Sequence, residues 1–252
     1  MSRVISIVNQ KGGVGKTTTA INLAAGLAVL EKKTLLIDLD PQGNSSSGLG
    51  INKNEIEQHI YQVIIGKTKI EETILPASID NLFIIPANIN LTGAEIELVK
   101  EFAREQKLKE ALKSIVDDYE YIIIDCPPSL GLLSVNALTA STDVIIPIQC
   151  EYFALEGVSQ LLNTVRLIQQ SLNPNLNIFG ILLTMYDKRL NLSNQVLNEV
   201  RRYFKEQVFE TVINRNVKLS EAPSYGKSIF EYDIKSVGSQ NYLELASEVV
   251  KR

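Results

Sequence analysis

The residues that most clearly indicate chemistry form a glycine-rich segment near the start of the chain. Residues 11–18 read Lys-Gly-Gly-Val-Gly-Lys-Thr-Thr, after an apolar run and before a segment with helical periodicity. Glycines let backbone N–H groups surround phosphate oxygens, and the start of the following helix adds a positive dipole. In such a loop Lys16 reaches the β- and γ-phosphates and the Thr17 hydroxyl binds Mg²⁺. The segment therefore predicts a nucleoside triphosphate site with Mg²⁺.

This loop departs from the usual phosphate-loop pattern at its first position. The pattern places a glycine five residues before the glycine of Gly-Lys-Thr, and that position holds Gln10, followed by a second lysine. The loop is therefore a variant of the motif. The residues that we expect to contact the nucleotide here are Gln10, Lys11, Gly12, Gly13, Val14, Gly15, Lys16, Thr17 and Thr18.

Acidic residues follow two other apolar runs. Asp38 and Asp40 end one run, and alternation along a strand places both on the side of the phosphate loop. Asp125 ends a run of three isoleucines, the arrangement of a Walker B motif. Ligands of parallel α/β sheets bind at the carboxyl ends of the strands, where these acids lie. The pattern predicts a Mg²⁺ site served by Thr17, Asp38 and Asp125.

Hydrolysis requires a water molecule held in line with the γ-phosphorus. A nearby carboxylate can orient this water or accept its proton, and we predict that Asp40 does so. Asp38 lies deeper along the strand and is expected to serve the Mg²⁺ shell. The sequence leaves open an exchange of roles between these two acids.

The elements expected to position these residues alternate along the chain. Short apolar runs rich in β-branched residues predict strands at 4–8, 34–39, 82–86, 121–124, 144–148 and 178–184. Spacings of three and four predict helices at 20–30, 94–116, 155–170 and 192–204. Nearly continuous apolar strands indicate a parallel sheet covered on both faces. We expect an α/β fold, one three-layer domain over residues 1–252, with residues 42–50 as a functional loop.

Composition narrows the function classes. The chain has 252 residues, 45% hydrophobic and 21% charged, which is typical of a globular protein. No apolar run is long enough for a membrane helix, and only Cys126 and Cys150 are present, so we expect a cytoplasmic protein without a disulfide framework. The net charge is −4, but residues 188–252 hold 11 Lys and Arg against 8 Asp and Glu, a balance of +3. A surface for a polyanion is therefore expected in this part of the chain.

These motifs together resemble a known family. The loop at 11–18 resembles that of the deviant Walker A ATPases, and with residues 38–44, 125–129, 180–189 and 214–226 the chain looks like a ParA-type partition ATPase, close to the chromosomal Soj proteins. The resemblance covers nearly the whole chain. It implies a homodimer formed on ATP binding, in which Lys11 crosses to the partner's phosphate, non-specific binding of double-stranded DNA, nucleoid association, and hydrolysis stimulated by a ParB-type protein.

The resemblance also implies further site residues. Asn214 and Asn216 would lie near adenine, together with Met185, which could instead fill the core. Basic residues would form the DNA-binding face, and of these Arg189, Arg215 and Lys218 are favoured. The DNA candidates are Lys188, Arg189, Arg201, Arg202, Arg215, Lys218 and Lys227.

The sequence supports three alternative functions less well. A nitrogenase-type iron protein needs a cluster-binding cysteine in a different context from Asp125-Cys126-Pro127. A MinD-like membrane-associated ATPase ends in a basic amphipathic helix, whereas residues 243–252 carry two acids, so no stable membrane association is expected. A nucleotide-gated scaffold with negligible hydrolysis stays open. His59, the one histidine, is expected to be solvated, and Cys126 and Cys150 to be small buried residues.

Overall fold

The computed structural model describes residues 2–151 and 154–252. Within them, seven strands form a sheet in the order β3-β4-β2-β5-β1-β6-β7, and β3 pairs antiparallel to β4 while the other pairs are parallel. All six predicted strands are confirmed, with small shifts of their ends. The strands are β1 Arg3–Ile7, β2 Thr34–Asp38, β3 Leu75–Pro76, β4 Leu82–Ile85, β5 Tyr121–Asp125, β6 Asp143–Gln149 and β7 Asn177–Thr184.

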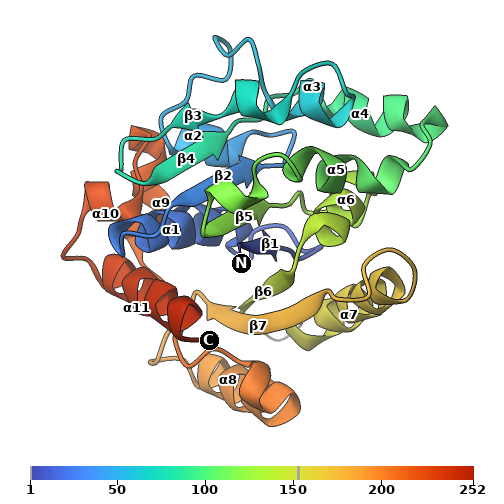
Figure 1. Cartoon of the computed structure of the whole chain (residues 1–252). Coiled ribbons are helices and arrows are strands. Elements are labelled where there is room, and N and C mark those ends of the chain that lie inside the picture. Colours follow the sequence, from blue (N-terminus) through green and yellow to red (C-terminus); the bar gives the residue numbers. More distant parts are fainter. Residues whose placement is uncertain (1, 152–153) are drawn as a thin grey trace.

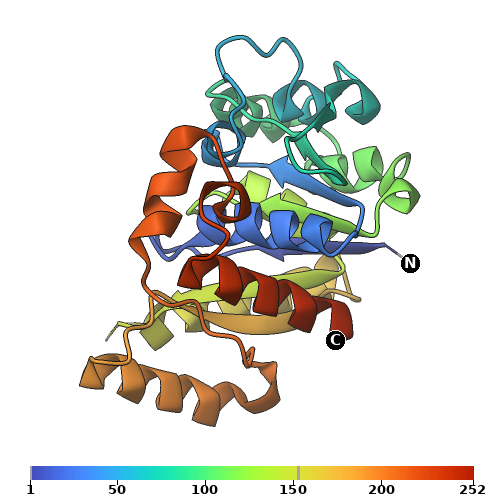
Figure 2. The ribbon, with the colours of Figure 1, turned by 90° about the vertical axis from the view of Figure 1, so that its left-hand side faces the viewer.

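Helices cover both faces of this sheet (Figures 1 and 2). On one face α1 packs against α11, and their buried side chains form one apolar cluster with the sheet. On the other face α3 to α7 form a second cluster, which also takes in α8. The predicted three-layer α/β fold is therefore confirmed. The helices are α1 Lys16–Val29, α2 Asn44–Gly48, α3 Ile60–Ile64, α4 Leu91–Glu97, α5 Lys107–Leu112, α6 Leu132–Ala140, α7 Ala154–Ser171, α8 Asn191–Phe204, α9 Val217–Glu221, α10 Ile229–Tyr232 and α11 Val237–Lys251.

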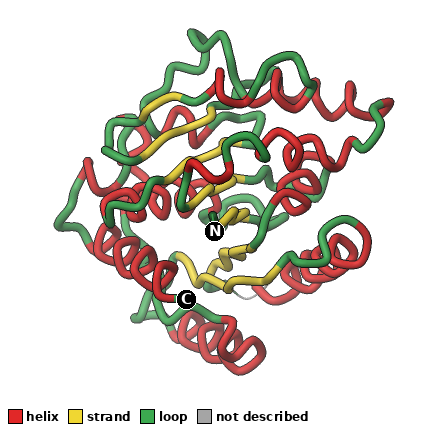
Figure 3. Tube along the Cα trace, viewed as in Figure 1, coloured by secondary structure: helices red, strands yellow, loops and turns green. Residues whose placement is uncertain are grey.

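The prediction of one long helix over residues 94–116 is wrong. The structure has α4, α5 and short 3₁₀ turns there, visible as short helical pieces joined by loops in Figure 3. Ala103 adopts a left-handed conformation with φ of 50°, which ends the helical path. The Asn136 side chain of α6 donates to the Arg104 carbonyl at 2.8 Å and accepts from the Leu108 N–H at 3.2 Å. A distant side chain thus satisfies backbone groups that a continuous helix would have paired internally.

The structure also differs from two local predictions, those for residues 42–50 and for His59. Residues 42–50 contain the short helix α2 rather than an irregular loop throughout, and Gly43 before it has φ of 60°, which glycine adopts without strain. His59 is not solvated: it is 3% exposed and precedes α3, where its backbone N–H donates to Gln62 Oε1 at 2.8 Å. Burial lowers the pKa of His59, because it disfavours the charged form of the imidazole.

Strand β7 supplies a test of core packing. A Cβ added at Gly180 would lie 2.4 Å from the ring of Phe209, whose side chain is buried and packs edge-on against Phe179. We expect Gly180→Ala to lower the free energy of unfolding by about 2 kcal/mol through overpacking, measured by urea denaturation.

The matched control is Gly93→Ala in α4, where an added Cβ makes only ordinary contacts and alanine favours the helix. A second variant, Gly180→Ala with Phe209→Leu, should cost less than the sum of its single changes. An unchanged denaturation midpoint for Gly180→Ala would contradict the packing argument.

Candidate functional site

The glycine-rich loop connects the carboxyl end of β1 to α1. Gly13 and Gly15 have φ of 75° and 89°, and L side chains rarely adopt such angles, so these two positions require glycine. The Thr184 hydroxyl, at the end of β7, donates to the Val14 carbonyl at 2.8 Å and fixes the loop from outside. The loop therefore presents its backbone N–H groups at the start of α1, an arrangement suited to phosphate.

The two lysines of the loop occupy different environments. Lys16 is buried and its Nζ donates to the Lys11 carbonyl at 3.0 Å, inside the loop. Burial lowers the pKa of Lys16, while the negative charges of Asp125 and Asp40 oppose that shift. The Lys11 side chain is 44% exposed and forms an ion pair with Glu151 at 3.3 Å. Lys16 thus lines its own phosphate site, and Lys11 lies at the surface beside it.

The three predicted acids meet at one edge of the sheet. Strand β5 lies between β1 and β2, and Asp125 is in register with Ile7 on one side and Asp38 on the other. This places the two buried carboxylates of Asp38 and Asp125 next to the loop that follows β1. This register agrees with the expectation that the acids lie next to the phosphate loop.

Asp125 has the environment of a metal ligand. It is fully buried, the Ser45 hydroxyl donates to its Oδ2 at 2.7 Å, and among the described residues its Oδ1 has no hydrogen-bond partner. Burial, together with the nearby charge of Asp38, raises the pKa of Asp125 to about 7, although hydrogen bonding by Ser45 and Thr17 acts to lower it. A buried carboxylate with a free oxygen beside a threonine hydroxyl fits Mg²⁺, which binds through few protein ligands and substrate phosphates.

Asp38 and Asp40 have distinct surroundings. Asp38 Oδ2 accepts hydrogen bonds from the backbone N–H and the hydroxyl of Ser46, at 2.8 and 2.7 Å, and its Oδ1 accepts from the Asp40 N–H at 3.2 Å. Burial raises the pKa of Asp38 to about 6. Asp40 is also buried, and one of its oxygens accepts from the Gln42 N–H at 2.9 Å. Asp38 therefore anchors the segment that carries Asp40, and its place in the metal shell stays a prediction.

A small cavity of about 140 Å³ lies beside the start of α1. Met185, Asn214 and Asn216 all line it, so the structure brings together the three residues expected near a base. Met185 is half-buried with φ of 52°, a conformation that costs energy for a residue with a side chain. The cavity also includes Gly15, Thr18, Thr184 and Tyr242.

The basic candidates are all exposed. The Arg189 guanidinium donates to both oxygens of Asp187, at 2.9 and 2.7 Å, and these bonds hold the pKa of Asp187 at about 2. Arg215 lies on the same side, because its N–H donates to the Tyr186 carbonyl at 2.9 Å.

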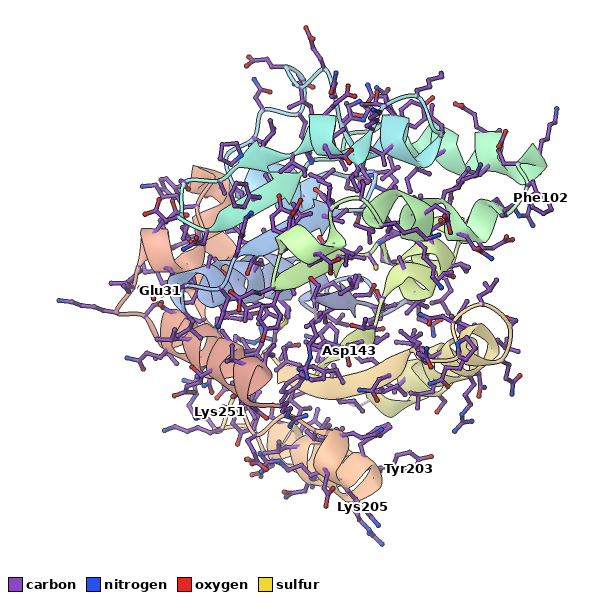
Figure 4. All side chains as sticks on the ribbon, in the orientation of Figure 1. Glu31, Phe102, Asp143, Tyr203, Lys205 and Lys251 are labelled. Atoms are coloured by element: carbon purple, nitrogen blue, oxygen red, sulfur yellow. The ribbon has the colours of Figure 1, made fainter. Side chains whose placement is uncertain are left out.

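The other basic candidates come from several elements. Arg202 stands near the end of α8, about 17 Å along the helix from its start, and Figure 4 shows the neighbouring Tyr203 and Lys205 projecting there. Lys218 in α9 forms an ion pair with Glu221 at 3.1 Å. The other exposed candidates are Lys188, Arg201, Arg202, Lys218 and Lys227.

The cysteines and the C-terminal helix, which bear on the alternative functions, pack in the core. Cys126 and Cys150 are both buried free thiols, as expected, and burial raises the pKa of each, that of Cys150 to about 12. The apolar side of α11, including Leu245 and Val249, is buried in the apolar cluster that α11 forms with α1 and the sheet. No helix in the described part of the chain has the length and apolarity to span a membrane.

Several supporting residues were missed at the sequence level. Ser45 and Ser46 bind the acids, and Asn241 of α11 binds Asn214. The two serines stand in a polar stretch directly after Asp40, which was a usable signal. Asn241 lies 27 positions from its partner and leaves no local pattern.

The fold and this site define a P-loop nucleotide-binding protein with two lysines in its phosphate loop. A family model described as an AAA domain matches residues 2–178. The chain is 58% identical to the sporulation initiation inhibitor protein Soj of Bacillus subtilis, covering 99% of this chain and 98% of that protein. It is 56% identical to the chromosome partitioning protein ParA of Myxococcus xanthus, covering 100% and 89%.

Further relatives agree with this class. The chromosome-partitioning ATPase Soj of Treponema pallidum is 52% identical, covering 100% of this chain and 98% of that protein. A Mycobacterium smegmatis structure named cobyrinic acid a,c-diamide synthase, solved with ADP and magnesium, is 37% identical with a TM-score of 0.88, covering 100% and 95%. The chain belongs to the ParA/Soj family of chromosome-partitioning ATPases.

The buried acids make stability depend on pH. Their pKa values in the folded protein, about 7 for Asp125 and about 6 for Asp38, exceed the ordinary value of 3.8, so the folded state binds more protons than the unfolded state between about pH 4 and 7. The free energy of unfolding therefore falls as the pH rises through this window. Without nucleotide or Mg²⁺, Asp125→Asn should lessen that loss and raise the Tm at pH 8 by about 4 °C, measured by calorimetry.

Asp80→Asn is the matched control, because it makes the same change of side chain at an exposed position. It should follow the wild-type pH dependence. An Asp125→Asn protein with the same loss of Tm between pH 5 and 8 as the wild type would show that the carboxylate is not the source.

Proposed function

We propose that this ATPase binds ATP with Mg²⁺, dimerises around the nucleotide, binds DNA non-specifically as a dimer, and leaves DNA after a slow hydrolysis stimulated by a ParB-type protein. The observation that carries the proposal is the placement of the two lysines. Lys16 faces its own loop, whereas Lys11 lies at the surface, held by an ion pair between two half-exposed side chains. Such an ion pair contributes little energy, so Lys11 is free to reach a partner's phosphate, as an arginine finger does.

The acids support a hydrolytic role for the same site. Asp125, with Thr17 beside it, would hold Mg²⁺. When bound there, the metal would supply positive charge that offsets the negative charge developing on the phosphates. Asp40 lies near Lys16 at the phosphate end of the loop and would orient the attacking water. The charge of Asp38 raises the pKa of Asp125, and Asp38 would hold the segment that carries Asp40 in place through its bond to the Asp40 N–H.

Arg189 and Arg215 are the favoured centre of the DNA face, and Lys218 in α9 extends it. One such face is small, and the chain as a whole is acidic. Two copies of the face in a dimer would double the number of phosphate contacts, and binding to DNA depends steeply on that number. Because ATP would bring two such faces together in a dimer, ATP could control DNA binding without a large movement within one subunit. We infer that residues 1–252 act as one unit, located in the cytoplasm on the nucleoid.

The first test is DNA binding by the full chain across a salt series with ATP, ADP or no nucleotide, measured by fluorescence anisotropy. Binding should require ATP and weaken steeply with salt, because counterions are released from the phosphates. Arg215→Ala should lower affinity about tenfold and flatten the salt dependence, and Arg202→Ala, far along α8, should change both less. Lys11→Ala should bind ATP but neither dimerise nor bind DNA.

An absence of DNA binding in every nucleotide state would remove the DNA face and favour a membrane or protein partner. A Lys11→Ala protein that still forms the ATP dimer would remove the crossing role of Lys11. These two outcomes separate the parts of the proposal.

The second test concerns hydrolysis. Asp40→Ala should lower the ATPase rate by about 100-fold, because one positioned acid–base group contributes that order of rate, and it should trap the ATP dimer on DNA. Phosphate release and DNA dissociation would be measured together, with the exposed Asp80→Asn variant as control. Rapid hydrolysis by Asp40→Ala would remove Asp40 from the mechanism, and negligible hydrolysis by the wild type would favour the nucleotide-gated scaffold.

A further inference from the structure

Strand β1 ends opposite a proline of the neighbouring strand β6. The two strands run parallel in a register that pairs Ile7 with Ile145, and the Val8 N–H still donates to the Ile145 carbonyl at 3.1 Å. The next bond of a parallel ladder would run from the N–H of residue 147 to the Val8 carbonyl. Pro147 has no N–H, so the ladder stops here and the chain after β1 turns into the glycine-rich loop.

The Asn9 side chain takes the place of the missing backbone connection. Asn9 is 4% exposed, and its Nδ2 donates to the Pro147 carbonyl at 2.8 Å. Its Oδ1 accepts from the Lys11 N–H, two positions further along the chain, at 3.0 Å. An asparagine that bonds a backbone group two residues on forms a turn of defined geometry. Asn9 therefore connects the first turn of the loop to the end of the sheet.

The main chain of Lys11 is held on both sides. Its N–H is bound by Asn9, and its carbonyl accepts from Lys16 Nζ at 3.0 Å. Lys16 is the lysine that we expect on the phosphates, so a nucleotide would compete for the second bond. Asn9 is buried and bound to β6, so the first bond can stay in place when Lys16 turns to a phosphate.

The side chain of Lys11 is held more weakly than its main chain. Its Nζ lies 3.3 Å from Glu151 Oε2, and the two side chains are 44% and 48% exposed. An ion pair between such exposed groups contributes little to stability and is screened by salt. Breaking the buried bonds of Asn9 is costly, because it leaves polar groups without partners. The loop thus combines a fixed backbone at Lys11 with a side chain that is free to move.

We propose that Asn9 is the positioning residue for Lys11. By fixing the Lys11 N–H, Asn9 sets the direction in which the side chain leaves the backbone, towards the surface where a second copy of the chain would bring its phosphate. Asn9 itself touches no reacting atom. Fixing the backbone in advance reduces the conformational freedom that is lost when the two copies meet. The inference rests on the proposed crossing role of Lys11 and adds the residue that prepares it.

The test separates nucleotide binding by one subunit from the assembly of two. The affinity of the full chain for ADP would be measured by calorimetry, and dimerisation with a slowly hydrolysed ATP analogue by analytical ultracentrifugation. Asn9→Ala should weaken the dimer by about tenfold, the value of one net hydrogen bond. It should keep the ADP affinity within about threefold, because Lys16 and the glycines of the loop are unchanged.

A conservative variant and a matched control identify the bond that matters. Asn9→Ser retains an oxygen that can accept the Lys11 N–H, so it should keep dimerisation within about threefold of the wild type. Asn173→Ala is the control, because Asn173 is also buried and its Nδ2 donates to the Leu138 and Ser141 carbonyls at 3.0 and 2.7 Å. It should lower the free energy of unfolding, as Asn9→Ala does, without weakening the dimer.

The contrary outcomes are distinct. An ADP affinity that falls as much as dimerisation in Asn9→Ala would make Asn9 a support of the whole loop and overturn the inference. Equally weak dimers of Asn9→Ser and Asn9→Ala would exclude the bond to Lys11 as the cause. A wild type that stays monomeric with the ATP analogue removes the crossing role of Lys11 and this inference together. A wild-type dimer that Asn9→Ala leaves unchanged removes this inference alone.

Discussion

The site depends on one electrostatic constraint: two carboxylates are buried side by side at the carboxyl edge of the sheet. Strand register places Asp38 beside Asp125, and burial raises the pKa of both. Ser45 and Ser46 satisfy part of this charge, but one oxygen of Asp125 has no partner among the described residues. A buried charge without a partner is unfavourable, so the folded chain is organised to gain stability when a cation arrives.

The same constraint links the proposed metal site to the segment that carries Asp40. Asp38 holds Ser46 in α2, and the Ser46 hydroxyl in turn accepts a hydrogen bond from the Ala87 N–H at 2.9 Å. Asp40 lies between the end of β2 and this anchored helix, so its carboxylate is positioned from both sides. A change in charge at the proposed metal site would therefore act directly on the segment that carries Asp40, the residue that we propose orients water.

The sheet supplies rigidity and the connections supply chemistry. Strands buried on both faces leave little freedom at the carboxyl edge, where β1, β2 and β5 end together. Helix α11 then closes one face and contacts both α1 and the segment around Asn214. The positions that we propose for phosphate, metal and base are thereby formed by elements from the beginning, the middle and the end of the chain.

The sequence by itself determined the local parts of this protein. Continuous apolar runs identified the six longer strands. The glycine pattern with Lys16 and the acid after the isoleucine run predicted the phosphate and metal positions that we propose. These features are encoded in neighbouring residues, because strand burial and loop geometry act over a few positions.

Only the tertiary structure decided the interactions between distant positions. The helix predicted over 94–116 is interrupted at Ala103, and Asn136 pairs with the backbone there. His59 is buried, and Asn241 accepts a hydrogen bond from Asn214 from another helix. Such hydrogen bonds and burial depend on which segments meet in space, and no periodicity along the chain records that meeting. The physical reason is that buried polar groups need partners, and the fold alone determines which partners are within reach.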